Sequence, residues 1–203
     1  MLRRTIAERV VIEADKVKGS RFFATLAPAA DRRAVARVLA EVRQQWPDAT
    51  HHASAWRLGP DEAGCDDDGE VGGTAGPPIL ARLEGHGLEG VVAVVTRFYG
   101  GTKLGKGGLV RAYGGAASAA IEAVDIVEER VCSRVSVQCA HGLVGPLQGV
   151  AARFDGVVEV AWSHPPTVHI DVPVEAAHDL LEALVDRAAG QLDVLAAPGP
   201  VQG

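Results

Sequence analysis

The sequence contains few of the residues that mark specialised classes of protein. Of its 203 residues only 4% are aromatic, three are cysteines, and the longest uninterrupted aliphatic run is Val91 to Val95. A bilayer span needs roughly 18 apolar residues, so we expect no membrane helix. Glu8, Glu13 and Asp15 interrupt any apolar segment of a secretory signal, and we therefore expect a cytoplasmic protein.

The cysteines form no recognisable site. Cys65, Cys132 and Cys139 are odd in number and fit neither a disulfide framework nor a CxxC pair. We expect reduced thiols without a role, and we expect neither a metal ion nor another cofactor.

Basic residues are not in excess over acidic ones. The formal net charge is −6, which argues against a protein covered with basic nucleic-acid-binding surface. Residues 1–135 hold 18 basic and 18 acidic residues, whereas residues 136–203 hold 2 and 8. The acidic surplus therefore lies in the last third, which we expect to face solvent or a protein partner.

The length and an apolar content of 47% allow two small domains, each with its own core. In the last third, hydrophobic periods near 2 and 3.6 alternate in the order β-α-β-β-α-β, which is typical of a ferredoxin-like domain. We place this domain at residues 135–203. Its expected elements are Arg134–Ala140, Leu143–Phe154, Val157–Ser163, Thr167–Val172, Val174–Ala189 and Gln191–Ala196.

Residues 1–134 form the other expected domain, of the α+β class with a βαβ arrangement. Asp31 is a candidate N-cap, and Pro47 ends the helix that follows it. The run Val91–Phe98 is so continuously apolar that we expect a central strand covered on both faces. The remaining expected elements are strands at Ile6–Val17, Phe22–Leu26, Thr50–Leu58 and Ile126–Arg134, and helices at Ile79–Leu83 and Leu109–Val124.

A basic, glycine-rich loop follows the central strand. The sequence RFYGGTKLGKGGLVR, from Arg97 to Arg111, contains no acid and matches neither a P-loop nor a dinucleotide fingerprint. Its backbone amides and the start of the next helix would favour an anion, although the glycines could also only shape tight turns. The candidate anion-binding residues are Arg97, Tyr99, Gly100, Gly101, Lys103, Gly105, Lys106, Gly107, Gly108 and Arg111.

An acidic segment runs from Asp61 to Glu70 without a compensating base. Six carboxylates repel one another, so such a loop is solvated unless a metal ion or a cationic partner neutralises it. The spacing of a calcium loop is missing. We favour a protein-partner surface or a contact with the basic loop. A possible second site combines His51, His52, Asp67, Asp68, Glu70 and Thr74.

His51 and His52 are neighbours on an expected strand, so their side chains point to opposite faces and cannot share one metal ion. One of them should be a buried, hydrogen-bonded histidine, and a general base is the alternative. No GxSxG or HExxH motif is present, and the aspartates beside Cys65 disfavour its thiolate. The sequence therefore favours a non-catalytic protein over a hydrolase.

Four ordered segments resemble signature stretches of the IMPACT family, in its bacterial branch. They are KGSRFFA from Lys18, ATHHASAW from Ala49, DDGE followed by GTAGPP, and VVTRFYGGTKLGKGGLVRAYGG from Val94. The family usually has proline after DDGE, where this chain has Val71, so we expect a looser turn there. The resemblance implies a first domain similar to domain IV of elongation factor G and a ferredoxin-like second domain similar to its domain V.

Eukaryotic members of the family regulate translation, so the resemblance implies a translation-associated role. Two hypotheses follow. In the preferred one, the protein is a non-catalytic module whose basic loop contacts RNA or the ribosome, with Tyr99 as a stacking group. In the other, it is an enzyme acting on a small phosphorylated or anionic substrate, with His51 or His52 as base and a carboxylate from Asp66 to Glu70 as acid or metal ligand.

Overall fold

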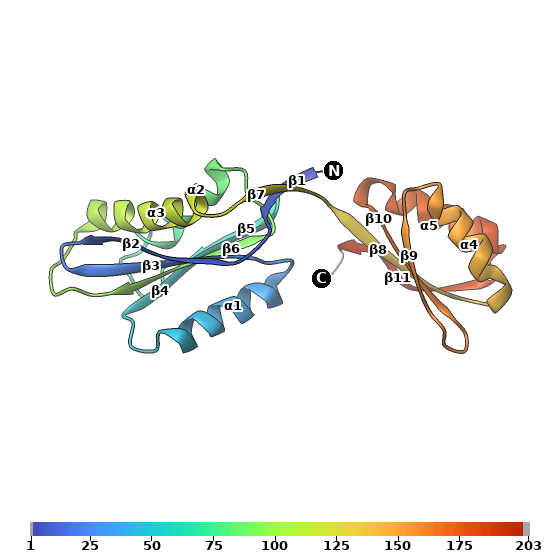
Figure 1. Cartoon of the computed structure of the whole chain (residues 1–203), viewed down its shortest axis with the longest axis horizontal. Helices are drawn as coiled ribbons and strands as arrows, with labels where there is room; N and C mark the ends of the chain where they lie inside the picture. The colour runs from blue at the N-terminus through green and yellow to red at the C-terminus, as the bar shows by residue number, and fades with distance from the viewer. Residues whose placement is uncertain (1, 201–203) are drawn as a thin grey trace. The chain divides into compact units, whose positions relative to one another are not determined.

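The chain forms two compact units (Figure 1). The computed structural model describes residues 2–200, with side chains as far as Ala196. Arg3–Glu129 make up the first unit, and the second begins at Arg130 and also includes Leu2. The boundary expected after residue 134 falls inside the first long strand of the second unit.

The first unit is a five-stranded sheet with helices on both faces (Figure 1). Strand order is β2-β3-β6-β4-β5, and all four neighbouring pairs are antiparallel. Helices α2 and α3 cover one face and α1 covers the other. The elements are β2 Val10–Val17, β3 Ser20–Pro28, α1 Arg32–Gln45, β4 His51–Gly59, β5 Glu62–Asp66, α2 Gly76–Gly85, β6 Val91–Phe98 and α3 Lys106–Glu122.

Strand β6 is central, and every residue from Val91 to Arg97 is buried, which confirms the strand expected from the apolar run. Val91, Ala93 and Val95 belong to the core beneath α2 and α3, whereas Val92 and Val94 belong to the core beneath α1. Because alternate side chains of a strand face opposite sides of a sheet, two cores require two apolar sets, and this explains the unbroken run.

Helix α1 begins where the sequence predicts. The side chain of Asp31 accepts a hydrogen bond from the Ala34 backbone amide at 2.7 Å, as an N-cap does. The helix ends at Gln45, before Pro47.

Several expected elements need correction. Ile6–Val17 is two strands, because β1 (Leu2–Ile6) leaves β2 and pairs with β7 (Ile126–Arg130). Glu62–Asp66, expected as part of a loop, is strand β5, which pairs with β4 and turns Cys65 toward the core. The strand expected over Ile126–Arg134 is interrupted at Val131.

Helix α3 begins at Lys106, three residues before the expected start. Gly105 has φ +72°, and its carbonyl accepts the Leu109 amide at 2.9 Å to close the first turn. Lys106, Gly107 and Gly108 therefore lie in the first helical turn and not in a loop.

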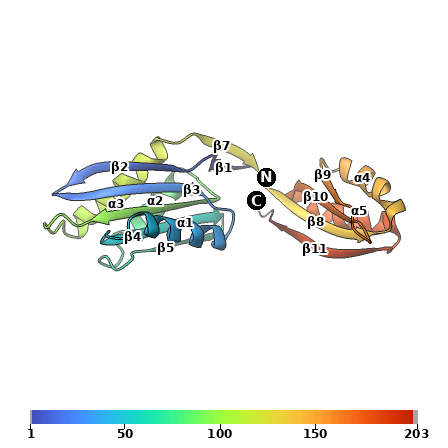
Figure 2. The same cartoon turned by 60° about the horizontal axis from the view of Figure 1, so that its bottom comes forward.

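The second unit is a four-stranded antiparallel sheet in the order β11-β8-β10-β9, with α4 and α5 on one face (Figure 2). Its element order is the predicted β-α-β-β-α-β. Leu180 and Leu184 of α5 lie fully buried in the helix–sheet core. The elements are β8 Cys132–Cys139, α4 Val144–Ala152, β9 Val157–Ala161, β10 Thr167–Pro173, α5 Ala177–Ala188 and β11 Leu192–Pro200.

Candidate functional site

The acidic and basic segments meet in the first unit. Glu70 follows β5, and Arg97 lies near the end of β6. Their side chains are only 5% and 6% exposed, and a guanidinium nitrogen (Nη1) of Arg97 donates to Oε1 of Glu70. Removing one partner of a buried ion pair leaves the other charge buried without a counter-charge, which strongly destabilises the fold. Arg97 is therefore a paired structural cation.

A second donor reaches the same carboxylate oxygen, and a histidine lies near it. The Tyr113 hydroxyl of α3 donates to Oε1 of Glu70 at 2.7 Å, and His51 Nε2 lies 3.8 Å from it. Burial and the neighbouring Glu70 raise the pKa of Tyr113, so this phenol stays protonated and remains a donor. Within residues 2–196, no hydrogen bond reaches the other oxygen, Oε2, of Glu70.

The three adjacent aspartates shape the turn that delivers Glu70. Asp67 accepts from the amides of Gly73, Ala75 and Gly76 at 2.7–2.9 Å and so caps the start of α2. Burial acts to raise the pKa of Asp67, but the three amides outweigh it and hold that pKa below its usual value. This acid has a structural role that the sequence analysis did not assign.

Asp68 connects the turn to β4. Its carboxylate accepts from the His52 amide at 2.6 Å and pairs with Arg43 at 2.6 Å, and its own φ is +48°. The turn at Val71 is closed, because the Val71 carbonyl accepts from both the amide and the hydroxyl of Thr74. Thr74 is buried there.

The two histidines occupy opposite faces of β4. His52 is buried and its Nδ1 lies 3.1 Å from the Thr96 hydroxyl, which confirms the expectation of one buried, hydrogen-bonded histidine. Burial, as the largest cause, lowers the pKa of His52, so the ring is neutral near pH 7. His51 is partly exposed, and its Nδ1 lies 2.8 Å from the Asp68 carbonyl.

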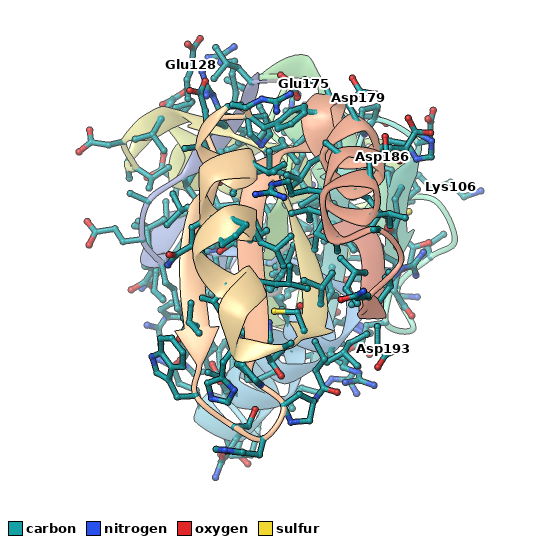
Figure 3. The ribbon with its side chains drawn as sticks, turned by 90° about the vertical axis from the view of Figure 1, so that its right-hand side faces the viewer. Lys106, Glu128, Glu175, Asp179, Asp186 and Asp193 are labelled. Atoms are coloured by element: carbon teal, nitrogen blue, oxygen red, sulfur yellow. The ribbon has the colours of Figure 1, made fainter. Side chains whose placement is uncertain are left out.

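A cleft of about 540 Å³ opens above Glu70. Glu70, Arg97 and His51 belong to its lining, together with Tyr99, Lys103 and Lys106. Tyr99 is 47% exposed, and the Arg97 guanidinium lies 5.4 Å from its ring centroid. Both lysines are exposed, and Lys106 extends away from the ribbon (Figure 3).

A second hollow of about 290 Å³ lies next to the cleft, since Leu104 belongs to the lining of both. Its cations are Lys18 and Arg111, which are exposed. In the part of the chain with described side chains, no ion pair involves Lys18, Lys103, Lys106 or Arg111. These four cations are therefore available to an anionic ligand.

The glycines of the basic loop have different roles. A Cβ on Gly100 would lie 2.0 Å from the carbonyl carbon of Gly19, so the two backbones are in direct contact, and the Gly100 amide donates to the Ser20 hydroxyl at 3.1 Å. Gly101 and Gly105 have positive φ values, which favour glycine. The structure thus gives these three glycines a backbone role.

Three residues of the site were not predicted from the sequence: Tyr113, Ser20 and Lys18. In the sequence, Tyr113 fits the apolar face of a buried helix, and nothing near it indicates a polar role. Its contact with Glu70 is visible only in the folded structure. Ser20, which accepts from Arg97 and Gly100, and Lys18 both lie in the KGSRFFA segment that carried the family resemblance. That segment was the available signal.

Within the described residues, no group of three or more histidine, cysteine, aspartate or glutamate side chains could hold a metal ion. Burial, with Asp67 and Asp66 next in effect, raises the pKa of the Cys65 thiol, as the neighbouring aspartates led us to expect. Among the described helices, none is long and apolar enough to cross a membrane.

A scan against protein families matches residues 18–121 to the Impact N-terminal domain. This range contains Glu70, Arg97, Tyr113 and all four unpaired cations. The chain belongs to the IMPACT family.

Relatives extend the similarity to the whole chain. The chain is 34% identical to the IMPACT family member YigZ of Escherichia coli, over 90% of this chain and 92% of that one. It is 33% identical to the IMPACT family member YvyE of Bacillus subtilis, over 88% and 83%. A crystal structure described as that of a hypothetical protein is similar with a TM-score of 0.72 and 32% identity, covering 96% of this chain and 97% of that one.

Proposed function

We propose that this protein is a translation-associated, non-catalytic binding protein that contacts RNA or the ribosome through the start of α3. The observation that carries the proposal is the group of four exposed cations without an ion-pair partner, Lys18, Lys103, Lys106 and Arg111, around two adjoining hollows. We call this group the basic rim. Phosphate contacts of this kind supply most of the sequence-independent affinity of proteins for nucleic acids.

The start of α3 supports anion binding at the basic rim. The helix has 17 residues, no acid in its first turn and no side-chain cap, so its first amides and its positive end face the ligand side. Arg97, by contrast, is engaged by Glu70 and contributes little net charge. We therefore assign phosphate contacts to the basic rim and not to Arg97.

We extend the proposal to the fold type of each unit. We propose that the second unit is ferredoxin-like, supported by its element order and its strand order β11-β8-β10-β9. We propose likewise that the first unit is similar to domain IV of elongation factor G, supported by family membership. Asp179, Asp186 and Asp193 of the second unit project outward (Figure 3), and we assign this acidic side to solvent or a protein partner.

The proposal is tested by sedimentation of the protein with ribosomal subunits and by binding to single-stranded RNA, each at several salt concentrations. If four phosphates are contacted, the log–log salt slope should be about −3 to −4. The double variant Lys103→Glu and Lys106→Glu should lose most of the affinity and flatten the slope. Both side chains are exposed, and an acid at a helix start is favourable, so this variant should fold.

The matched control is the double variant Arg33→Glu and Arg37→Glu. These arginines are also exposed and undergo the same charge change, but they lie on α1, on the opposite face of the sheet. The control should bind like the parent protein. Equal losses in both variants, or an affinity that does not depend on salt, would refute the assignment to the basic rim.

A second candidate function is supported by the cleft itself. A buried carboxylate, Glu70, with the imidazole of His51 at 3.8 Å could serve acid–base chemistry on a small phosphorylated or anionic substrate. The variant His51→Ala separates the two functions. Loss of turnover with RNA binding unchanged would favour the enzyme, and absence of turnover in the parent protein would favour the binding protein.

A further inference from the structure

We propose that the cleft is a nucleotide pocket, which accepts one unstacked nucleotide of a single-stranded RNA. The base lies against Tyr99 and donates a hydrogen bond to Oε2 of Glu70, while the phosphate lies on Lys103 and Lys106. This inference rests on the proposed function, because it describes how the same surface holds one part of the bound strand.

The size of the cleft agrees with a single nucleotide. Its volume of about 540 Å³ lies within the range of about 300–1,000 Å³ typical of small-molecule sites. A folded strand or a duplex is far larger, so only one unit of the polymer can enter. The rest of the strand then follows the basic rim toward Lys18 and Arg111, which line the adjoining hollow.

The cleft offers a hydrogen-bond acceptor in addition to its cations. Glu70 is 5% exposed and lines the cleft, and the three contacts described for its carboxylate all fall on Oε1. Oε2 thus has no donor from the described residues and remains available as a hydrogen-bond acceptor. A phosphodiester has no proton to donate to it, whereas every nucleobase carries an N–H donor and each ribose carries a 2′-hydroxyl.

A buried donor without a partner belongs to the neighbouring Arg97. Arg97 also lines the cleft, is 6% exposed in its side chain, and its Nε has no hydrogen-bond partner among the described atoms. Buried polar groups are normally paired, and exceptions call for an explanation. Because this nitrogen is shielded from solvent, the contact that the cleft offers to a base is the acceptor Oε2 of Glu70 and not Arg97 Nε.

Tyr99 supplies the stacking surface. The ring is 47% exposed and lines the cleft, and its backbone amide donates to the Thr50 hydroxyl at 3.0 Å. The Arg97 guanidinium lies 5.4 Å from the ring centroid, a cation–π distance that helps to hold the ring in place. Exposed aromatic rings beside cationic grooves are the usual platforms for unpaired bases.

The test compares two labelled strands of roughly 12 nucleotides, a single-stranded RNA and an abasic strand with the same number of phosphates. Binding is measured by fluorescence anisotropy with the full chain. We expect the RNA to bind about tenfold more tightly than the abasic strand. The variant Tyr99→Ala should remove this preference while leaving the affinity for the abasic strand unchanged.

Trp162→Ala is the matched control, because Trp162 is also an exposed aromatic residue, at 69%, but lies in the second unit. It should leave the preference intact. Glu70→Gln should also reduce the preference for RNA, because the side-chain NH2 group of glutamine cannot accept a hydrogen bond from the base. Circular dichroism shows whether this variant folds. The test with Tyr99→Ala does not depend on that result, because Tyr99 is exposed.

The outcomes separate this inference from the proposed function. Equal, salt-dependent affinity for both strands overturns the nucleotide pocket and leaves RNA binding by the basic rim in place. No binding of either strand overturns both. A preference for RNA that survives in Tyr99→Ala also overturns the pocket as described.

Discussion

Glu70 connects three elements of the first unit through one side chain. Arg97 of β6 and Tyr113 of α3 donate to its Oε1, and His51 of β4 lies near the same atom. Removing the carboxylate would leave a buried guanidinium and a buried phenol without their acceptor, which is more costly than the loss of the bonds themselves. At this residue, the stability of the fold and the proposed ligand binding depend on the same group.

The close contact at Gly100 predicts how substitutions there change the free energy of unfolding. Gly100→Ala should lower the free energy of unfolding by about 1–3 kcal/mol, because the new methyl group would overlap the Gly19 backbone. Gly115→Ala is the control: it lies within α3 with open space around it, so alanine should stabilise by about 0.5–1 kcal/mol. Urea unfolding measures both, and a stable Gly100→Ala protein would contradict the backbone contact.

At the scale of elements, the turn from Asp66 to Thr74 is fixed by its own side chains and not by packing alone. Asp67 accepts from three amides, two of them at the start of α2, and Asp68 bonds to β4. The helix start, the strand and Glu70 are thereby held in one arrangement.

Replacing Asp67 by alanine should cost about 1–2 kcal/mol of unfolding free energy, since α2 loses its cap. The pKa of Asp67 is lower in the folded protein than its ordinary value of 3.8, so its contribution is present above pH 3.8 and is lost as pH falls through the depressed value. Parallel urea titrations at neutral and acidic pH should show the difference from the parent protein shrinking in acid. Asp61→Ala, at an exposed position, should change little at either pH.

Hydrophobic periodicity predicted the helices and strands that have a uniformly apolar face. It did not predict strand β5, which is rich in charged residues. Strand β6 and helix α1 were predicted because their cores require regular apolar positions. Strand β5 was missed because Glu62 and Asp66 lie on its exposed positions and a propensity argument assigns acids to loops. The Glu70–Arg97 pair joins residues 27 apart, and no local pattern shows which of six acids meets which of four cations.

At the scale of the whole molecule, the two units have separate clusters of buried apolar residues. Those of the first lie beneath α1 and beneath α2 and α3, and that of the second lies beneath α4 and α5. The family match, residues 18–121, falls entirely within the first unit.

We therefore expect the fragment 1–131 to fold alone and to keep the affinity of the full chain for single-stranded RNA. It retains β1 and β7, which pair with each other, and all of the basic rim. Circular dichroism measures folding, and fluorescence anisotropy measures RNA binding. Fragment 130–203 is the control, which should fold but should not bind the RNA. RNA binding by the second fragment would contradict the assignment of the site.

The contact between Gly19 and Gly100 also bears on how ligands leave. The turn that carries Lys18 and the loop that carries Tyr99 touch backbone to backbone and are joined by the hydrogen bond from the Gly100 amide to the Ser20 hydroxyl, so a movement of one is transmitted to the other. The two hollows should then open in concert, and a strand spanning both should dissociate in a single kinetic step.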